Sequence, residues 1–317
     1  MTLPRILFFG TPAFAAIGLQ ALIQSGACEV AAVVTQPDRP AGRGKSLQKS
    51  PVKELAELQR IPILQPENIR RSETAFLEAA AELGPFDLGV VIAFGQILPA
   101  SVLALPLRNC INVHASLLPR WRGAAPIQRA ILAGDTETGV GLMRVEAGLD
   151  TGPVYSETRV KIDPADTFET LHDALAKAGA ALLVKHLSAI ARGELRPTPQ
   201  SGTGITQAAK LSNAESRIIW SAPALEVDRL VRALSPVPGA FTCLSGKRIK
   251  VFRGAPEMDR EQPVPPGTII ECSSDTLQVQ CGLGSFRLVE LQLEGKKRLA
   301  VKEFLRGFPL SINMAFE

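Results

Sequence analysis

An asparagine and a histidine stand two residues apart in the run Asn-Val-His, at Asn112 and His114. The apolar, β-branched residues 110–113 predict a buried strand, and residues two apart on a strand point to the same side. The turn that follows ends at Pro119, which restricts its own backbone and that of the residue before it. The sequence therefore predicts an amide and an imidazole side by side at the carboxyl end of a strand, where α/β folds bind ligands.

A carboxylate stands farther along the chain, at Asp150 in the glycine-flanked run Gly-Leu-Asp-Thr-Gly. It follows the apolar residues 140–145, which predict another buried strand. An asparagine at a strand end usually serves a turn, and a lone histidine is usually structural. At the ends of neighbouring strands, however, an amide, an imidazole and a carboxylate can act together on a carbonyl group. Asn112, His114 and Asp150 are therefore the candidate catalytic residues.

The elements that position these side chains follow from the hydrophobic pattern. Up to about residue 191, apolar runs alternate with helical patterns, which favours a doubly wound, mostly parallel, Rossmann-like α/β sheet. We expect strands at residues 5–9, 29–35, 61–64, 87–93, 110–113, 139–146 and 154–160. We expect helices from residue 13 and at residues 51–59, 72–83, 126–132 and 167–191.

The pattern changes after this region. Residues 192–207 are rich in proline and glycine and predict an interdomain linker. One helix is expected at residues 222–234, and short strands separated by turns follow it. That succession favours a small β-barrel of the oligonucleotide-binding (OB) type. We therefore expect a catalytic domain at residues 1–191, a linker at 192–207 and an OB-like barrel at 208–317.

Composition limits the class of protein. Among the 317 residues, 46% are hydrophobic and 21% are charged, which is ordinary for a soluble globular protein. The first residues lead directly into a strand and do not resemble a signal peptide. Apolar runs fall short of the roughly 18–20 residues that a membrane span needs. We expect a cytoplasmic protein without a membrane partner, and a monomer by default.

The same inspection argues against several cofactors. The five cysteines are widely spread and none forms a Cys-x-x-Cys pair, so neither a disulfide framework nor a metal site is expected. The first turn, Gly-Thr-Pro at residues 10–12, lacks the glycine pattern of a dinucleotide site and the lysine of a P-loop. We therefore expect neither NAD nor ATP.

Basic residues gather in two places. Residues 36–53 carry five basic and one acidic residue in a stretch rich in glycine and proline, which suits an arm that contacts phosphates. A solvated loop is the alternative. From residue 208 onward there are fifteen Lys and Arg against twelve Asp and Glu. A basic barrel favours docking of nucleic acid through its backbone, and a merely soluble surface is the alternative.

The motifs resemble those of a known family. The run Asn-Val-His-Ala-Ser-Leu-Leu-Pro, followed by Asp-Thr-Gly, is similar to the folate-dependent formyltransferases. The resemblance extends over nearly the whole chain, with matches at residues 10–12, 35–44, 119–128, 210–212 and 295–297. The Asn, His and Asp set is shared by the whole family. The basic loop and the added barrel resemble the members that act on methionyl-tRNA.

The resemblance implies transfer of the formyl group of 10-formyltetrahydrofolate to the α-amino group of methionine on initiator methionyl-tRNA, for translation initiation. Asn112 would stabilise the oxyanion, His114 would relay a proton, and Asp150 would hold His114. The folate would be bordered by Phe94, Ser116, Leu117, Leu118 and Pro119. The tRNA would contact Arg39, Arg43, Lys45, Lys247, Arg248 and Lys296.

Other activities fit the same residues. A 10-formyltetrahydrofolate hydrolase would use water in the same pocket and release formate without an acceptor. An amino-sugar formyltransferase would share the catalytic residues and formylate a nucleotide sugar. From a different class, a noncatalytic RNA-binding protein would bind tRNA and be insensitive to loss of His114.

Overall fold

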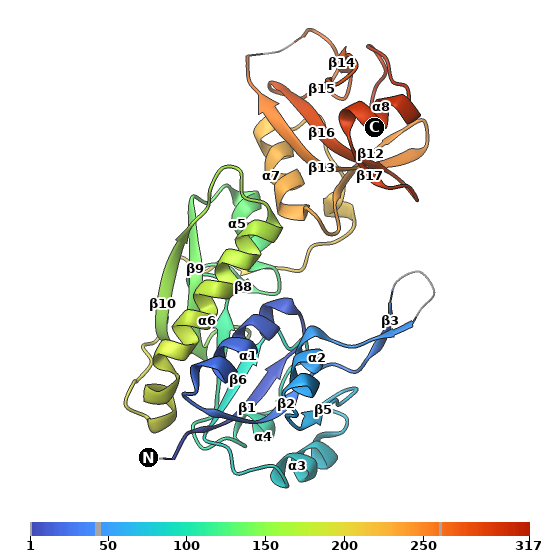
Figure 1. Cartoon of the computed structure of the whole chain (residues 1–317). Coiled ribbons are helices and arrows are strands. Elements are labelled where there is room, and N and C mark those ends of the chain that lie inside the picture. Colours follow the sequence, from blue (N-terminus) through green and yellow to red (C-terminus); the bar gives the residue numbers. More distant parts are fainter. Residues whose placement is uncertain (1, 42–45, 260–261) are drawn as a thin grey trace. The chain divides into compact units, whose positions relative to one another are not determined.

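The computed structural model describes residues 2–41, 46–259 and 262–317 (Figure 1). The chain forms two compact units, and each unit collects more than one stretch of sequence. Unit 1 consists of Met1–Gly123, Glu137–Lys161 and His172–Gln207, and unit 2 of Ala124–Thr136, Ile162–Leu171 and Ala208–Glu317. The residues predicted as a linker, 192–207, lie in unit 1, and the domain boundaries at residues 191 and 208 stay a prediction.

Unit 1 is built on a seven-stranded sheet with the order β10-β9-β7-β6-β1-β2-β5. Its strands are β1 (Arg5–Gly10), β2 (Glu29–Val34), β5 (Ile63–Leu64), β6 (Leu88–Ile92), β7 (Cys110–His114), β9 (Glu137–Arg144) and β10 (Val154–Lys161). The five strands from β5 to β7 are parallel, and β9 and β10 join antiparallel at one edge. The predicted α/β fold with a mostly parallel sheet is confirmed.

Helices cover both faces of this sheet. They are α1 (Ala13–Ser25), α2 (Pro51–Leu58), α3 (Glu73–Ala81), α4 (Ala100–Leu103) and α6 (Phe168–Arg192). Two small sheets, β3 (Arg39–Ala41) with β4 (Ser46–Gln48) and β8 (Arg122–Gly123) with β11 (Gln207–Ala208), lie outside the main one.

The packing of α6 decides which way β7 presents its side chains. At Gly179 of α6 an added Cβ would lie 2.9 Å from Val113, so the helix backbone is pressed against that strand. On the opposite face Cys110 packs in one core cluster with residues of α3 and α4. Because side chains alternate along a strand, Asn112 and His114 point away from α6, on the face that carries Cys110.

Helix α6 is long and apolar enough to cross a membrane when length and composition alone are considered. Its most apolar window has a mean hydropathy of 1.4, and 50% of that window is buried inside the protein. The close approach at Gly179 shows that the helix packs on the sheet of unit 1. Its apolar face is therefore accounted for by the core.

Unit 2 contains a six-stranded antiparallel sheet with the order β12-β13-β16-β15-β14, and β17 pairs with β16. Its strands are β12 (Ala240–Leu244), β13 (Lys247–Glu257), β14 (Ile269–Cys272), β15 (Leu277–Gln280), β16 (Ser285–Leu293) and β17 (Arg298–Ala300). The helices are α5 (Pro126–Ala133), α7 (Ala224–Leu234), α8 (Val301–Gly307) and the short 3-10 helix η1 (Ala214–Ser216).

The end of the chain pairs with both outer strands of this sheet. Ile269 of β14 donates its N–H to the Met314 carbonyl at 2.8 Å, and Glu317 donates to the Cys243 carbonyl of β12 at 2.9 Å. Unpaired strand edges invite association, and these bonds satisfy part of both edges. A separate β domain is therefore present as predicted, the structure shows its sheet to be antiparallel, and its closure as an OB-type barrel stays a prediction.

Glu215 gives a test of stability within unit 2. Its carboxylate accepts bonds from Arg129, at 2.7 Å, and from the N–H and hydroxyl of Ser212. These bonds, that of Arg129 most of all, lower the pKa of Glu215 from 4.5 to about 2. A lowered pKa in the folded state means that the charged form stabilises the fold above pH 4.5, and that this contribution is lost as the pH falls toward 2.

We therefore expect Glu215→Gln to reduce the free energy of unfolding at pH 7. The side chain is 42% exposed, which limits the loss to about 1 kcal/mol or less. The difference from the wild type should shrink steadily between pH 5 and pH 3 in urea denaturation. Glu294→Gln, at an exposed glutamate of the same unit, is the control. A difference that stays constant with pH would contradict the assignment.

Candidate active site

His114 ends β7 and is 5% exposed. Its Nε2 lies 2.9 Å from the carbonyl oxygen of Trp121. A carbonyl oxygen only accepts, so Nε2 carries a proton. The other nitrogen, Nδ1, lies 3.6 Å from Oδ2 of Asp150. When Nδ1 carries a proton, this contact is an ion pair. When it does not, the lone pair of Nδ1 faces the Asp150 carboxylate. The two groups therefore lie within ion-pair distance and beyond the length of a direct hydrogen bond.

Asn112 and Gly123 contact the same carboxylate. Nδ2 of Asn112 lies 3.5 Å from Oδ1 of Asp150, and the N–H of Gly123 donates to Oδ2 at 2.8 Å. The amide nitrogen of asparagine carries two hydrogens, which is one more than this contact uses. The structure thus brings together the side chains of Asn112, His114 and Asp150, and the Asp150 side chain keeps 13% of its surface exposed.

The route by which Asp150 arrives differs from the expected one. Strand β9 runs antiparallel to β7, with Arg144 opposite Ile111, so β9 ends near the amino end of β7. The sequence reasoning assumed that these two strands end at the same edge of the sheet, and the structure shows that they do not. Residues 145–153 instead fold back over β7 to return the carboxylate to His114. The direction of β9 was not encoded in its apolar run, because parallel and antiparallel strands share the same alternation.

Gly152 allows this loop to fold back. A Cβ added there would lie 1.9 Å from the carbonyl oxygen of Arg144. We expect Gly152→Ala to lower kcat by about tenfold to a hundredfold, since a displacement near 1 Å of a catalytic group has costs of this order. Steady-state kinetics would measure it. Gly202→Ala, where an added Cβ meets nothing within 4 Å, is the control, and equal rates in both variants would refute the prediction.

The turn predicted to border the folate lies directly after His114. Ser116 is fully buried and its hydroxyl donates to the Arg120 carbonyl at 2.6 Å, which closes the turn. Leu117, Leu118 and Pro119 are partly exposed. Phe94 is 2% exposed, and its ring packs edge-on against that of Phe9 with 5.6 Å between the ring centres. The ring therefore belongs to the core, and the Phe94 carbonyl oxygen accepts from the side chains of Thr11, at 3.0 Å, and Gln36, at 3.2 Å. A contact between Phe94 and the folate stays a prediction.

The basic arm is partly described. Arg39 lies exposed in β3, and Arg43 and Lys45 lie outside the described residues. The base of the arm is held by Asp38, which accepts bonds from Lys53 at 2.6 Å and from Gln65 at 2.9 Å. These bonds, that of Lys53 first, lower the pKa of Asp38. The two strands of the arm therefore start from a fixed base.

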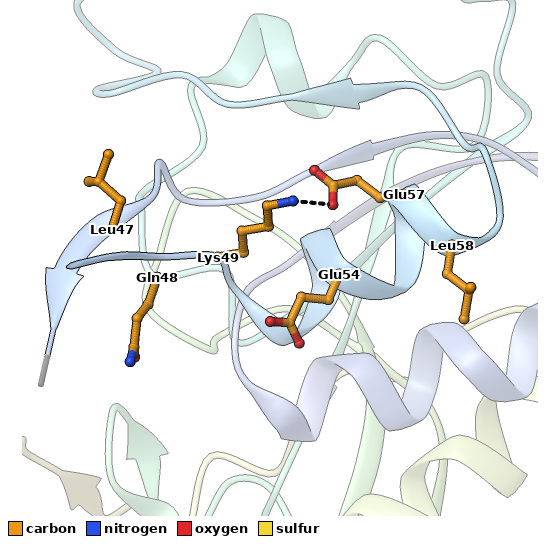
Figure 2. Close-up of a pocket in the computed structure, with 6 residues that line it drawn as sticks. All are labelled: Leu47, Gln48, Lys49, Glu54, Glu57 and Leu58. Atoms are coloured by element: carbon orange, nitrogen blue, oxygen red, sulfur yellow. Dashed lines mark hydrogen bonds and ion pairs between the residues drawn. The ribbon is translucent and has the colours of Figure 1, made fainter.

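A surface hollow of about 890 Å³ lies between β4 and α2. It is lined by Leu47, Gln48, Lys49, Glu54, Glu57 and Leu58. Figure 2 shows Lys49 reaching from the end of β4 to Glu57 on α2, with 2.6 Å between Nζ and Oε2. The lining includes none of the three candidate catalytic residues, so this hollow belongs to the arm.

The basic residues predicted in unit 2 gather at one end of its sheet. Lys247 and Arg248 begin β13, and the Glu294 N–H donates to the Arg248 carbonyl, which brings the turn with Lys296 beside them. Lys247 and Lys296 are exposed. Arg248 is partly buried, and its guanidinium lies 3.5 Å from the ring centre of Phe241. The Phe241 ring therefore covers part of the guanidinium surface.

Sequence reasoning missed two side chains that hold the Asp150 loop. Gln200 donates to the carbonyls of Asp150 and Gly152, and it accepts from Arg122. Gln200 stands among prolines and glycines in the predicted linker, where no local pattern marks it. Arg122 lies in a stretch that carries the family resemblance, which was the one signal available.

Comparison with known proteins agrees with this geometry. The formyl transferase family profile matches residues 4–187, and the profile of its C-terminal domain matches residues 210–309. A methionyl-tRNA formyltransferase of Magnetococcus marinus is 49% identical over 307 residues, covering 97% of this chain and 96% of the relative. One of Burkholderia thailandensis is 48% identical, covering 98% and 96%.

Solved structures share the fold. HypX from Aquifex aeolicus in complex with tetrahydrofolic acid matches with a TM-score of 0.67 at 19% identity. The match covers 98% of this chain and 48% of HypX, so the chain spans about half the length of that protein. An N-formyltransferase from Helicobacter canadensis, in complex with folinic acid and dTDP-3-aminofucose, matches with a TM-score of 0.64 at 16% identity, over 94% of this chain and 100% of its own. With relatives at 48–49% identity over nearly its full length, the chain belongs to the methionyl-tRNA formyltransferase family.

Proposed function

We propose that the protein transfers the formyl group of 10-formyltetrahydrofolate to the α-amino group of methionine on initiator methionyl-tRNA, for translation initiation. The observation that carries this proposal is the meeting of Asn112, His114 and Asp150 in a chain of the methionyl-tRNA formyltransferase family. Folate is a co-substrate here, and no metal takes part in the proposed reaction.

The chemistry follows from the three side chains. The attacking amine must be neutral, and α-amino groups titrate near pH 8 (about 7.7–8.0) in model peptides. Its lone pair forms a bond to the formyl carbon, and Asn112 donates an N–H to the oxyanion that results. The His114 and Asp150 pair takes the proton that the amine loses. When the bond between the formyl carbon and N10 breaks, that proton passes to N10 of tetrahydrofolate.

The substrates need separate surfaces. We place the folate along Ser116, Leu117, Leu118 and Pro119, which follow His114 directly. The tRNA would meet the arm through Arg39, Arg43 and Lys45, and unit 2 through Lys247, Arg248 and Lys296. In this proposal residues 1–191 catalyse, residues 192–207 connect, and residues 208–317 dock the tRNA. The protein would act in the cytoplasm as a monomer, without a membrane partner.

The arm gives a prediction about the acceptor alone. Replacing Arg43 and Lys45 with alanine is expected to raise KM for methionyl-tRNA by roughly tenfold and to lower the salt dependence of binding, by about one unit of slope per lost phosphate contact. KM for the folate should stay unchanged. Lys177→Ala, at an exposed lysine of α6, controls for loss of positive charge. A rise in the KM for folate would count against the arm as an acceptor site.

The function itself is tested by measuring formyl transfer from 10-formyltetrahydrofolate to methionyl-initiator tRNA. Transfer to the methionine amine is the expected result. Release of formate without an acceptor would identify a hydrolase. Transfer to a nucleotide amino sugar and not to methionyl-tRNA would identify a sugar formyltransferase. Binding of tRNA without any formyl transfer, and without an effect of His114→Ala, would identify a noncatalytic RNA-binding protein.

A further inference from the structure

The side-chain amide of Gln200 forms hydrogen bonds with two other segments of the chain, residues 150–152 and the segment of Arg122. Nε2 donates to the Asp150 carbonyl at 2.8 Å and to the Gly152 carbonyl at 2.7 Å. Oε1 accepts from Arg122, at 3.0 Å from Nε and 2.7 Å from Nη2. A side-chain amide has two donor hydrogens and two acceptor lone pairs, so these four bonds fill its capacity.

Hydrogen bonds of Gln200, Arg122 and Gly123 hold both the main chain and the side chain of Asp150. Gln200 bonds to the main chain of Asp150, and Arg122 bonds to Gln200. Gly123, the next residue after Arg122, donates its N–H to the Asp150 carboxylate at 2.8 Å. The carboxylate that faces His114 is thereby fixed from both ends. The segment that supplies Gln200 is anchored as well, since Thr206 accepts from the N–H of Arg122 at 3.0 Å.

The backbone conformation of Asp150 indicates why these hydrogen bonds matter. Its φ is +51°, in the left-handed region that residues other than glycine seldom adopt. Residues in this region persist where surrounding contacts determine them, and they gather at functional sites. Without Gln200 the two carbonyls could bond to water, so the loss of these bonds need not unfold the loop. The loop would gain other conformations instead.

We propose that Gln200, braced by Arg122, is a positioning residue that sets the Asp150 carboxylate against His114 and Asn112. This inference rests on the proposed function, because it takes Asp150 as part of the catalytic machinery. Gln200 acts through Asp150 and does not meet the substrates. Its loss should therefore lower kcat and leave the binding of both substrates unchanged.

The first test is Gln200→Leu, which keeps much of the volume and removes all four bonds. We expect kcat for formyl transfer to fall by about thirtyfold to a hundredfold, with both KM values within about threefold of the wild type. Gln200→Glu, which can still accept from Arg122 but cannot donate to the two carbonyls, should be impaired to a similar degree. Gln207→Leu, at an exposed glutamine of the same segment, should match the wild type. Wild-type kcat in Gln200→Leu would overturn the proposal.

A double-mutant cycle separates positioning from general loss of structure. In an Asp150→Asn background the carboxylate is already absent, so Gln200→Leu should lower the residual rate by less than about threefold. If Gln200 were merely structural, Gln200→Leu would lower the residual rate by the same factor as it lowers the rate of the wild type. Equal factors in the two backgrounds would therefore refute the assignment.

A spectroscopic readout keeps this test independent of the substrate. The protein has three histidines, so His114 can be resolved in an imidazole NMR spectrum beside His172 and His186. Gln200→Leu should shift the His114 ring resonances and leave the other two in place, and Gln207→Leu should shift none. An unmoved His114 would contradict the inference. If the wild type transfers no formyl group, the proposed function fails and this measurement still decides the positioning.

Discussion

Asp150→Asn is expected to lower kcat for formyl transfer by a factor of about 10³ to 10⁴, with little change in either KM. The carboxamide has nearly the same size as the carboxylate and can still accept the N–H of Gly123, so the loop should keep its shape. What it cannot do is form an ion pair with a protonated His114, whose Nδ1 lies 3.6 Å from Oδ2 in the wild type. The reaction would lose the carboxylate that, together with His114, receives the amine proton.

Single-turnover kinetics with saturating methionyl-tRNA would measure this loss directly. Glu78→Gln, at an exposed glutamate on α3 of the same unit, removes one negative charge away from His114 and should retain the wild-type rate. The melting temperature of Asp150→Asn should stay close to that of the wild type. A rate within about tenfold of the wild type would show that proton transfer does not depend on Asp150.

Asn112→Ala is expected to lower kcat by about 10²- to 10³-fold, which is the usual cost of removing one donor to an oxyanion. In free energy this is about 3 kcal/mol. The amide contacts Asp150 at 3.5 Å, a length at which a hydrogen bond is weak, so the change should act mainly on the transition state. KM should therefore move much less than kcat.

The comparison of kcat with KM makes this prediction specific. A loss of folate binding would raise KM for 10-formyltetrahydrofolate and leave the single-turnover rate at saturation intact, which would contradict the role of Asn112. Asn112→Asp should be at least as impaired as Asn112→Ala, since it removes the donor and places a second carboxylate beside Asp150. Asn213→Ala, at an exposed asparagine of unit 2, serves as the control.

Local patterns predicted much of this protein. The alternation along residues 110–114 places Asn112 and His114 on one face, and the structure has them there because Val113 packs on α6 at Gly179. The succession of strands and helices predicted the mostly parallel sheet, and the short strands after residue 234 predicted a second domain made of β-strands. These features depend on which face of an element is apolar, and that is encoded within a few residues.

Contacts between distant segments decided the rest. The antiparallel direction of β9, the return of Asp150 over β7 and the burial of Phe94 against Phe9 have no local signature. Gln200 lies 50 residues from Asp150 and 78 from Arg122 along the chain, in a stretch whose composition predicted only a linker. Hydrophobic periodicity states which side chains are buried. It does not state which partner a strand or a polar side chain meets, because the whole fold makes that choice.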